Sequence, residues 1–205
     1  MKKWIAIALL AVMVFSLAAC GQKKAEEPTV GGWTLNDSGA LTAEATGAFE
    51  KAVEGLMGVN YTPVALLGTQ PVSGTNYSIL TEATVVYPDA QPYYALVTGY
   101  EDLQGKAEIR NIAVLDLGKI AESGTVENAA AAEQLLGGWT VDREASVEVE
   151  DAVLHLASQV VSGTNHCVLC KGWTLKFVYE NLEGKTEVTQ SAALDIAALS
   201  QPAEG

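Results

Sequence analysis

The fold is decided by a short stretch that occurs twice: Gln-Pro-Val-Ser-Gly-Thr-Asn-Tyr at residues 70–77 and Gln-Val-Val-Ser-Gly-Thr-Asn-His at residues 159–166. Three further pairs keep the same order: Gly-Gly-Trp-Thr at 31–34 and 137–140, Tyr-Glu-Asp-Leu-Gln-Gly-Lys at 100–106 and Tyr-Glu-Asn-Leu-Glu-Gly-Lys at 179–185, and Ala-Val-Leu-Asp at 113–116 and Ala-Ala-Leu-Asp at 192–195. Four ordered matches indicate an internal duplication. The offset falls from 137 − 31 = 106 to 159 − 70 = 89 and then to 179 − 100 = 79, so the second copy is shortened.

The residues around the first stretch predict one helix followed by an antiparallel sheet. Apolar residues between Leu41 and Leu56 recur at spacings of three and four, so we expect a helix over residues 42–57 that Gly58 ends. Enrichment in β-branched and aromatic residues predicts about four strands, at 64–67, 76–87, 93–101 and 107–117. Polar segments at 88–92 and 102–106 predict hairpins. The expected class is α+β, with the helix packed on one face of the sheet.

The first twenty residues have the form of an export signal. Lys2 and Lys3 precede an apolar run at 4–17 that is too short to span a bilayer comfortably. The run ends in Leu-Ala-Ala-Cys at 17–20, which resembles the lipobox of bacterial lipoproteins. The resemblance implies cleavage after residue 19 and a lipid, palmitate among its acyl chains, on Cys20. We then expect an exported protein anchored to the cell membrane or envelope; a plain secretory signal with a chance cysteine is the alternative.

This pattern divides the chain into six segments. We expect a signal peptide at 1–19, a polar tether at 20–30, a first repeat at 31–117, a partly helical linker at 118–136, a shortened second repeat at 137–196 and a tail at 197–205. Within the linker, 118–126 is predicted irregular and 127–136 helical. The apolar residues from Val147 to Leu156 fit a helix and a strand about equally well, and we interpret them as a helix.

The motif Gln-x-Val-x-Gly, at 70–74 and 159–163, resembles the first inhibitory hairpin of the cystatin family. Gly-Thr-Asn-Tyr at 74–77 is similar to the stefin and plant versions, and Gly31-Gly32 resembles the N-terminal glycine of the family. The resemblance covers most of 31–117 and, more loosely, 137–196. It implies a single helix gripped by a curved antiparallel sheet, here duplicated. It also implies inhibition of papain-like cysteine proteases by a wedge of the N-terminal trunk and two hairpins.

The resemblance assigns the wedge to the same kinds of residue in each repeat: Gly32, Gln70, Val72 and Gly74 in the first, and Gly138, Gln159, Val161 and Gly163 in the second. Valine presents apolar area to a cleft, and glycine permits close backbone approach and a positive φ. The second hairpins, at 103–105 and 182–184, lack the Pro-Trp pair of type 2 cystatins. The repeated stretch could instead be the turn that this fold requires, and the alternative function is a non-inhibitory adhesion or ligand-binding module.

Composition and motifs argue against other functions. The formal charge is −13, from 12 basic and 25 acidic residues, so we expect no nucleic-acid partner. His166, Cys167 and Cys170 offer three soft ligands, but zinc needs a fourth, and a strand places the two cysteines on opposite faces. We interpret them as apolar strand residues and expect no metal or cofactor. With only His155 and His166 as histidines and no catalytic constellation, we predict that the protein is not an enzyme.

Overall fold

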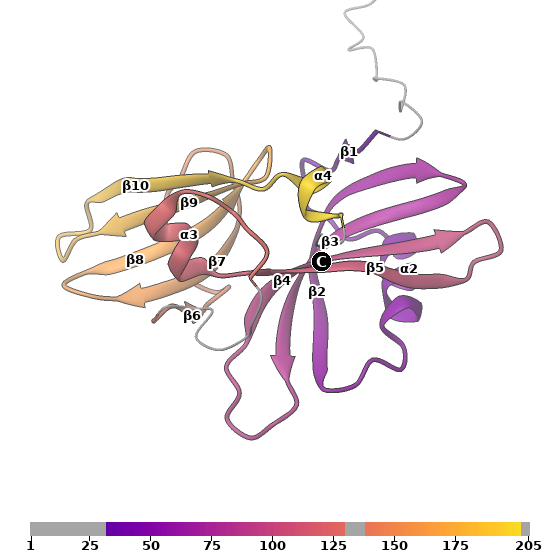
Figure 1. Cartoon of the computed structure of the whole chain (residues 1–205). Coiled ribbons are helices and arrows are strands. Elements are labelled where there is room, and N and C mark those ends of the chain that lie inside the picture. The colour runs from indigo at the N-terminus through magenta and orange to yellow at the C-terminus, as the bar shows by residue number, and fades with distance from the viewer. Residues whose placement is uncertain (1–31, 130–137, 202–205) are drawn as a thin grey trace, which may run out of the picture.

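The computed structural model describes residues 32–129 and 138–201, which form two five-stranded antiparallel sheets with few helices (Figure 1). The first sheet contains, in spatial order, β1 (Thr34–Leu35), β2 (Val59–Val72), β3 (Gly74–Val85), β4 (Tyr93–Asp102) and β5 (Ala107–Leu115). The second contains, in the same sense, β6 (Thr140–Val141), β7 (Ala152–Val160), β8 (Thr164–Cys170), β9 (Thr174–Glu180) and β10 (Thr186–Ala193). The predicted α+β class is confirmed.

All four strands predicted in the first repeat are present, and both predicted hairpins join them. The fifth strand, β1, pairs with β2 through Thr34 opposite Thr69. Sequence reasoning missed β1 because two residues are too few to show an alternation. Strands that follow one another in the chain are neighbours in the sheet, so each connection joins the ends of two adjacent strands.

Helix α2 (Ala43–Val53) covers one face of the first sheet, as predicted. Thr42 caps it by accepting a hydrogen bond from the backbone N–H of Ala45. Its buried residues pack against apolar side chains of β2, β3 and β4: Ala45, Ala48 and Phe49 against Leu66, Tyr77, Ile79 and Val97. The helix ends before the predicted residue 57 because Gly55 and Gly58 take φ of +82° and +91°, which right-handed helices exclude.

The other face of the first sheet packs on the second sheet in a shared core. Leu67, Leu80 and Leu96 of the first sheet belong to one apolar cluster with Leu156, Leu169 and Leu175 of the second. Two buried hydrogen bonds cross it: Tyr94 Oη donates to the carbonyl of Leu156 at 2.8 Å, and Trp173 Nε1 donates to the carbonyl of Leu67 at 2.6 Å. Trp173 stands 79 residues after Tyr94, and Leu156 stands 89 after Leu67, which are the repeat offsets. The two bonds are therefore equivalent, as across a two-fold interface.

Among the described residues, no helix covers the outer face of the second sheet, so the helix predicted around Val147 to Leu156 is wrong. Residues 144–150 are irregular, and Leu154 and Leu156 lie in β7. Leu156 is fully buried in the shared core, with Leu154 packed against that core. The shortened repeat lost its helix rather than a strand, and packing on the first sheet covers the face that carries Leu156.

Two short helices replace what was predicted as linker and tail. Helix α3 (Leu117–Ser123) lies in the predicted irregular segment, and α4 (Ile196–Leu199) begins the predicted tail. Asp116 and Asp195, an equivalent pair, cap them by accepting from the N–H groups of Lys119 and Ala198. Each helix buries two apolar residues, which is too short a pattern to recognise in the sequence.

Each of these helices packs on the sheet of the other repeat (Figure 1). Helix α3 lies against β10. In return, the carbonyl of Leu199 in α4 accepts from Asn111 Nδ2 on β5 at 2.7 Å, and Thr98 Oγ1 on β4 donates to Ser200 Oγ at 3.0 Å. These contacts of α3 and α4 join the two repeats in addition to the shared core.

Several sequence predictions lie outside the described residues. The signal peptide, the tether with Cys20, and most of the helix predicted at 127–136 are among them. Asn128, which is described, forms a β-bridge with Leu115 instead of a helical turn. Among residues 32–129 and 138–201, no helix has both the length and the apolar character to cross a bilayer.

Candidate functional site at the hairpin tips

The repeated stretch forms the turn of the β2–β3 hairpin. Val72 pairs with Gly74 across the tip, and Gln70 pairs with Asn76 just below it. Asn76 Nδ2 donates to Gln70 Oε1 at 2.6 Å, which closes the hairpin below the turn. Tyr100 Oη on the neighbouring strand β4 donates to the carbonyl of Ser73 at 2.9 Å. Gln70 and Gly74 therefore serve the hairpin itself.

Gly74 allows the hairpin to approach β4 closely. Its φ is +145°, which side-chain-bearing residues rarely adopt. A Cβ on Gly74 would collide with the carbonyl oxygen of Glu101 and lie 2.8 Å from Cε2 of Tyr100. Both obstacles belong to β4, and the carbonyl oxygen of Glu101 is part of the backbone, so it cannot move without opening the sheet.

The second repeat builds the same hairpin from the equivalent residues. Asn165 Nδ2 donates to Gln159 Oε1 at 2.9 Å, and Tyr179 Oη donates to the carbonyl of Ser162 at 3.0 Å. Gly163 has a φ of +153°, and a Cβ there would collide with the carbonyl of Glu180. The sequence conserved between the repeats thus specifies a turn, which was the structural alternative for the motif.

A second hairpin tip stands beside the first in each repeat. Gly74 pairs with Asp102 of β4, so the β4–β5 turn lies next to the β2–β3 turn. Asp102 Oδ1 accepts from the N–H groups of Gln104 and Lys106, and Asn181 Oδ1 accepts in the same way in the β9–β10 turn. In the first repeat Lys51 Nζ, from the last turn of α2, also donates to Glu101 Oε1 at 2.7 Å and to the carbonyl of Gly105 at 3.1 Å.

The tips carry exposed apolar side chains. Val72 is 40 % exposed and its neighbour Leu103 is 80 % exposed. Val161 and Leu182 occupy the equivalent places and are 46 % and 88 % exposed, with Val160 beside them. In Figure 1 the β4–β5 and β9–β10 hairpins end at opposite margins of the molecule. The structure therefore presents one pair of apolar tips per repeat.

The glycines predicted for the N-terminal part of the wedge lie near the same hairpins. Gly32 is two residues before β1, whose pairing of Thr34 with Thr69 leads toward Gln70. Gly138 has a φ of +84°, and a Cβ there would lie 3.2 Å from Gln159 Nε2. Trp139, next in the chain, is buried and packs edge-on against Phe177, with ring centroids 5.5 Å apart. That tryptophan belongs to the core.

A groove lies behind each β2–β3-type hairpin. The first, of about 310 Å³, is lined by Trp33, Gln70, Asn76, Tyr100 and Arg110 together with the end of α4. The second, of about 510 Å³, is lined by the equivalent Trp139, Gln159 and Asn165 together with α3. The guanidinium of Arg110 stacks over the ring of Tyr100, 4.5 Å from its centroid. The repeated tryptophan, glutamine and asparagine thus form one wall of each groove.

Burial affects the ionisation of Tyr77, which lies in β3 below the first tip. Burial raises the pKa of Tyr77, and the nearby Glu101 carboxylate raises it further. Tyr77 therefore stays neutral at the foot of the hairpin.

The cysteines lie in β8, away from these tips. Cys167 and Cys170 are both free and buried, as expected for apolar strand residues, and burial raises the pKa of both thiols. Among the described residues, no group of three or more His, Cys, Asp or Glu side chains could hold a metal ion. Cys170 and His166 belong to the sheet rather than to a ligand cluster.

The structure brings together most of the predicted wedge and adds residues to it. Gln70, Val72 and Gly74 share one tip, as do Gln159, Val161 and Gly163. Sequence reasoning missed Leu103 and Leu182, whose signal was their identity at equivalent places in two polar turns. Comparisons of this chain with protein-family models, with curated proteins and with solved structures found no match.

Proposed function

We propose that the protein is a cystatin-like inhibitor of papain-like cysteine proteases, with one hairpin wedge in each repeat. The observation that carries the proposal is the pair of exposed apolar tips, Val72 beside Leu103 and Val161 beside Leu182. The residues beneath each tip are bonded within their hairpins, so the tips are presented on a stiff support. Apolar area on a preorganised loop is what insertion into a cleft needs.

The order of elements in the first repeat supports the proposal. A short strand, one helix and four further strands follow each other in the chain, and the helix covers one face of the sheet. This is the plan that the resemblance to cystatins implies. The second repeat keeps the sheet and both tips without the helix, which is consistent with a shortened copy of the same domain.

Val72→Asp is expected to weaken papain binding at the first wedge by about 100-fold, because the carboxylate would have to be desolvated in the cleft, and to leave the second wedge unchanged. Leu103→Asp is expected to act in the same direction. Both side chains are exposed in the free protein, so the free energy of unfolding should change by about 0.5 kcal/mol or less. The measurement is a titration of protease activity, with thermal melting of each variant.

Met57→Asp is the matched control, since Met57 is 93 % exposed and lies in the loop after α2 rather than at a tip. It should leave inhibition unchanged. Val161→Asp tests the second wedge separately. If the wild-type protein at micromolar concentration leaves several papain-like proteases active, the inhibitor proposal fails.

The grooves behind the hairpins favour a second candidate, a non-inhibitory ligand-binding module. Both grooves use the same repeated tryptophan, glutamine and asparagine, which combine a flat ring with amide donors and acceptors. Failure of protease inhibition together with ligand-dependent quenching of tryptophan fluorescence, lost in Trp33→Phe, would support this candidate.

Membrane attachment through a lipid on Cys20 is part of the proposal. Cys20→Ser is expected to move the cleaved protein from the detergent phase to the aqueous phase, because acyl chains rather than the acidic body would supply the membrane affinity. Phase partitioning of the native chain and the variant measures this. Full membrane retention of a cleaved Cys20→Ser protein would contradict it.

A further inference from the structure

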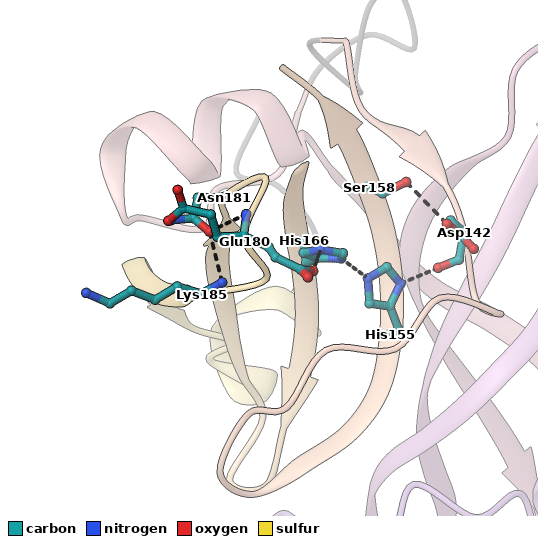
Figure 2. Close-up of polar contacts among 8 residues, drawn as sticks. Asp142, His155, Ser158, His166, Glu180, Asn181 and Lys185 are labelled. Carbon is teal, nitrogen blue, oxygen red and sulfur yellow. Dashed lines mark hydrogen bonds and ion pairs between the residues drawn. The ribbon is translucent and has the colours of Figure 1, made fainter. Parts of the chain in front are cut away.

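Two buried histidines, His155 and His166, take part in a row of three hydrogen bonds (Figure 2). The row crosses the face of the second sheet that is turned away from the first. His155 on β7 is 8 % exposed, and His166 on β8 is 5 % exposed. Nδ1 of His155 bonds the carbonyl of Asp142, and Nε2 of His155 lies 3.0 Å from Nδ1 of His166. Nε2 of His166 lies 3.1 Å from Oε2 of Glu180 on β9. These bonds link the segment that contains Asp142 to three strands, β7, β8 and β9.

The histidines stand where the first repeat has an apolar contact with its helix. The equivalent residues, at the repeat offset of 89, are Leu66 and Tyr77, which pack under α2. In the second repeat, residues 142–151 bond to this sheet instead. Besides the bond from Asp142 to His155, Lys176 Nζ donates to the carbonyl of Glu150 at 3.1 Å. A covering segment that offers carbonyls requires donors beneath it, and His155 and Lys176 supply them.

The three bonds need one more proton than two neutral imidazoles carry. The carbonyl of Asp142 and the carboxylate of Glu180 only accept, so each ring must donate from its outer nitrogen. The contact between the rings needs a proton as well, because two bare nitrogens would repel each other. Three protons are required, and two neutral rings hold two. Placing the additional proton on Glu180 instead leaves the total unchanged.

The surrounding charges suit one additional proton. Glu180 faces His166 directly, and the Asp142 carboxylate accepts from the N–H groups of Ala145 and Glu144 and from Ser158. The Ala145 N–H is the main cause that lowers the pKa of Asp142, and nearby His155 lowers it further. The other ionisable groups on the elements around the pair are Lys176 and Tyr179 on β9, Cys167 and Cys170 on β8, and Arg143, Glu144, Glu148, Glu150 and Asp151 in the covering segment.

We propose that His155, His166 and Glu180 form a one-proton switch that holds residues 142–151 on the second sheet. Loss of the proton leaves two nitrogen lone pairs facing each other. Moving the remaining His155 proton from Nδ1 to Nε2 relieves this repulsion and breaks the bond to the Asp142 carbonyl. Arg143, next in the chain, pairs with Glu82 of the first sheet at 3.6 Å, so the same segment also joins the repeats. The inference does not rest on protease inhibition.

The sign of the pH dependence follows from the proton count. In the unfolded chain the two imidazoles together hold two additional protons well below about pH 6.5 and none well above it. The folded chain needs one to make all three bonds, so it holds one as long as residues 142–151 are docked. Folding therefore releases a proton on the acid side and takes one up on the alkaline side, so stability is greatest near about pH 6.5 and falls in both directions.

Thermal melting of the full chain between about pH 5 and about pH 8 tests the switch. We expect the wild-type melting temperature to fall by about 3 °C from its maximum to the alkaline end. The measurement stops at about pH 8 because cysteine thiols of an unfolded chain begin to ionise above it. Burial raises the pKa of Cys167 and Cys170 in the folded protein, so these thiols would add their own pH dependence to the stability.

Glu180→Gln is the decisive variant, because an amide N–H can donate to Nε2 of His166. The three bonds can then all be made with two neutral rings, and the alkaline decline should disappear. Glu101→Gln, at the equivalent place in the first repeat, is the matched control and should keep the decline. An unchanged decline in Glu180→Gln, or no decline in the wild type, would overturn the switch.

Nitrogen-15 NMR of the ring nitrogens counts the protons on His155 and His166 without relying on a stability measurement. Near about pH 6.5 the wild type should show three protons shared by the two rings and Glu180, and Glu180→Gln should show two on the rings. If the variant does not fold, the wild-type count still decides. Two neutral rings beside an ionised Glu180 would refute the proposal.

Discussion

Trp173→Ala is expected to lower the free energy of unfolding by about 4 kcal/mol. Trp173 is fully buried between the two sheets, and truncation would leave a cavity in the core that both repeats share. It would also leave the carbonyl of Leu67 without its donor across the interface. In a protein of this size the melting temperature should drop by about 10 °C. Chemical denaturation of the full chain measures the loss directly.

Two variants separate the causes of that loss. Trp173→Phe keeps an aromatic ring but removes the N–H together with part of the indole, so it should cost about 1–3 kcal/mol, less than Trp173→Ala. Tyr94→Phe removes the equivalent donor on the other side of the interface and should cost a similar amount. A loss below about 1 kcal/mol for Trp173→Ala would mean that the two sheets do not depend on their shared core.

Gly74→Ala is expected to destabilise the first repeat by about 3 kcal/mol, because the added Cβ meets the backbone of β4 at a φ that alanine rarely adopts. Relief would require the β2–β3 turn to move away from β4. The hydrogen bond from Tyr100 to the carbonyl of Ser73 would then break as well. Denaturant unfolding and amide hydrogen exchange at the hairpin measure the effect.

Gly163→Ala should behave like Gly74→Ala, because Gly163 meets the carbonyl of Glu180 in the same way. Gly47→Ala is the control within the same repeat. Gly47 lies in α2 with nothing within 4 Å of an added Cβ, so alanine should be neutral or stabilise by up to about 1 kcal/mol. If Gly74→Ala is as harmless as Gly47→Ala, close approach to β4 is not what requires glycine.

Local patterns account for the parts of the fold that the sequence predicted. The helix before β2 follows from its apolar period and from Thr42, and the long strands follow from β-branched and aromatic runs. The hairpin motif was visible because its residues recur in both repeats. Its structural role followed only when Tyr100 and the carbonyl of Glu101 were seen to close on Ser73 and Gly74.

Contacts between the repeats explain the predictions that failed. Leu154 and Leu156 fit a helix as well as a strand, and packing on the first sheet selects β7. Leu117 and Ile120 carry too short a pattern to indicate a helix, but both are buried once α3 lies against β10. The surfaces on which β7 and α3 pack lie far from them in the sequence, so no local pattern predicts these contacts.

For the candidate site, too, the sequence determined one part and the tertiary structure another. The sequence by itself determined where the turns lie, because the glycine-containing stretches at 70–74 and 159–163 recur between apolar runs. Only the tertiary structure decided that Leu103 stands beside Val72, that Trp139 belongs to the core, and that His155 and His166 meet under residues 142–151. Turn geometry is a short-range property of the backbone, whereas adjacency and burial depend on how the two sheets pack.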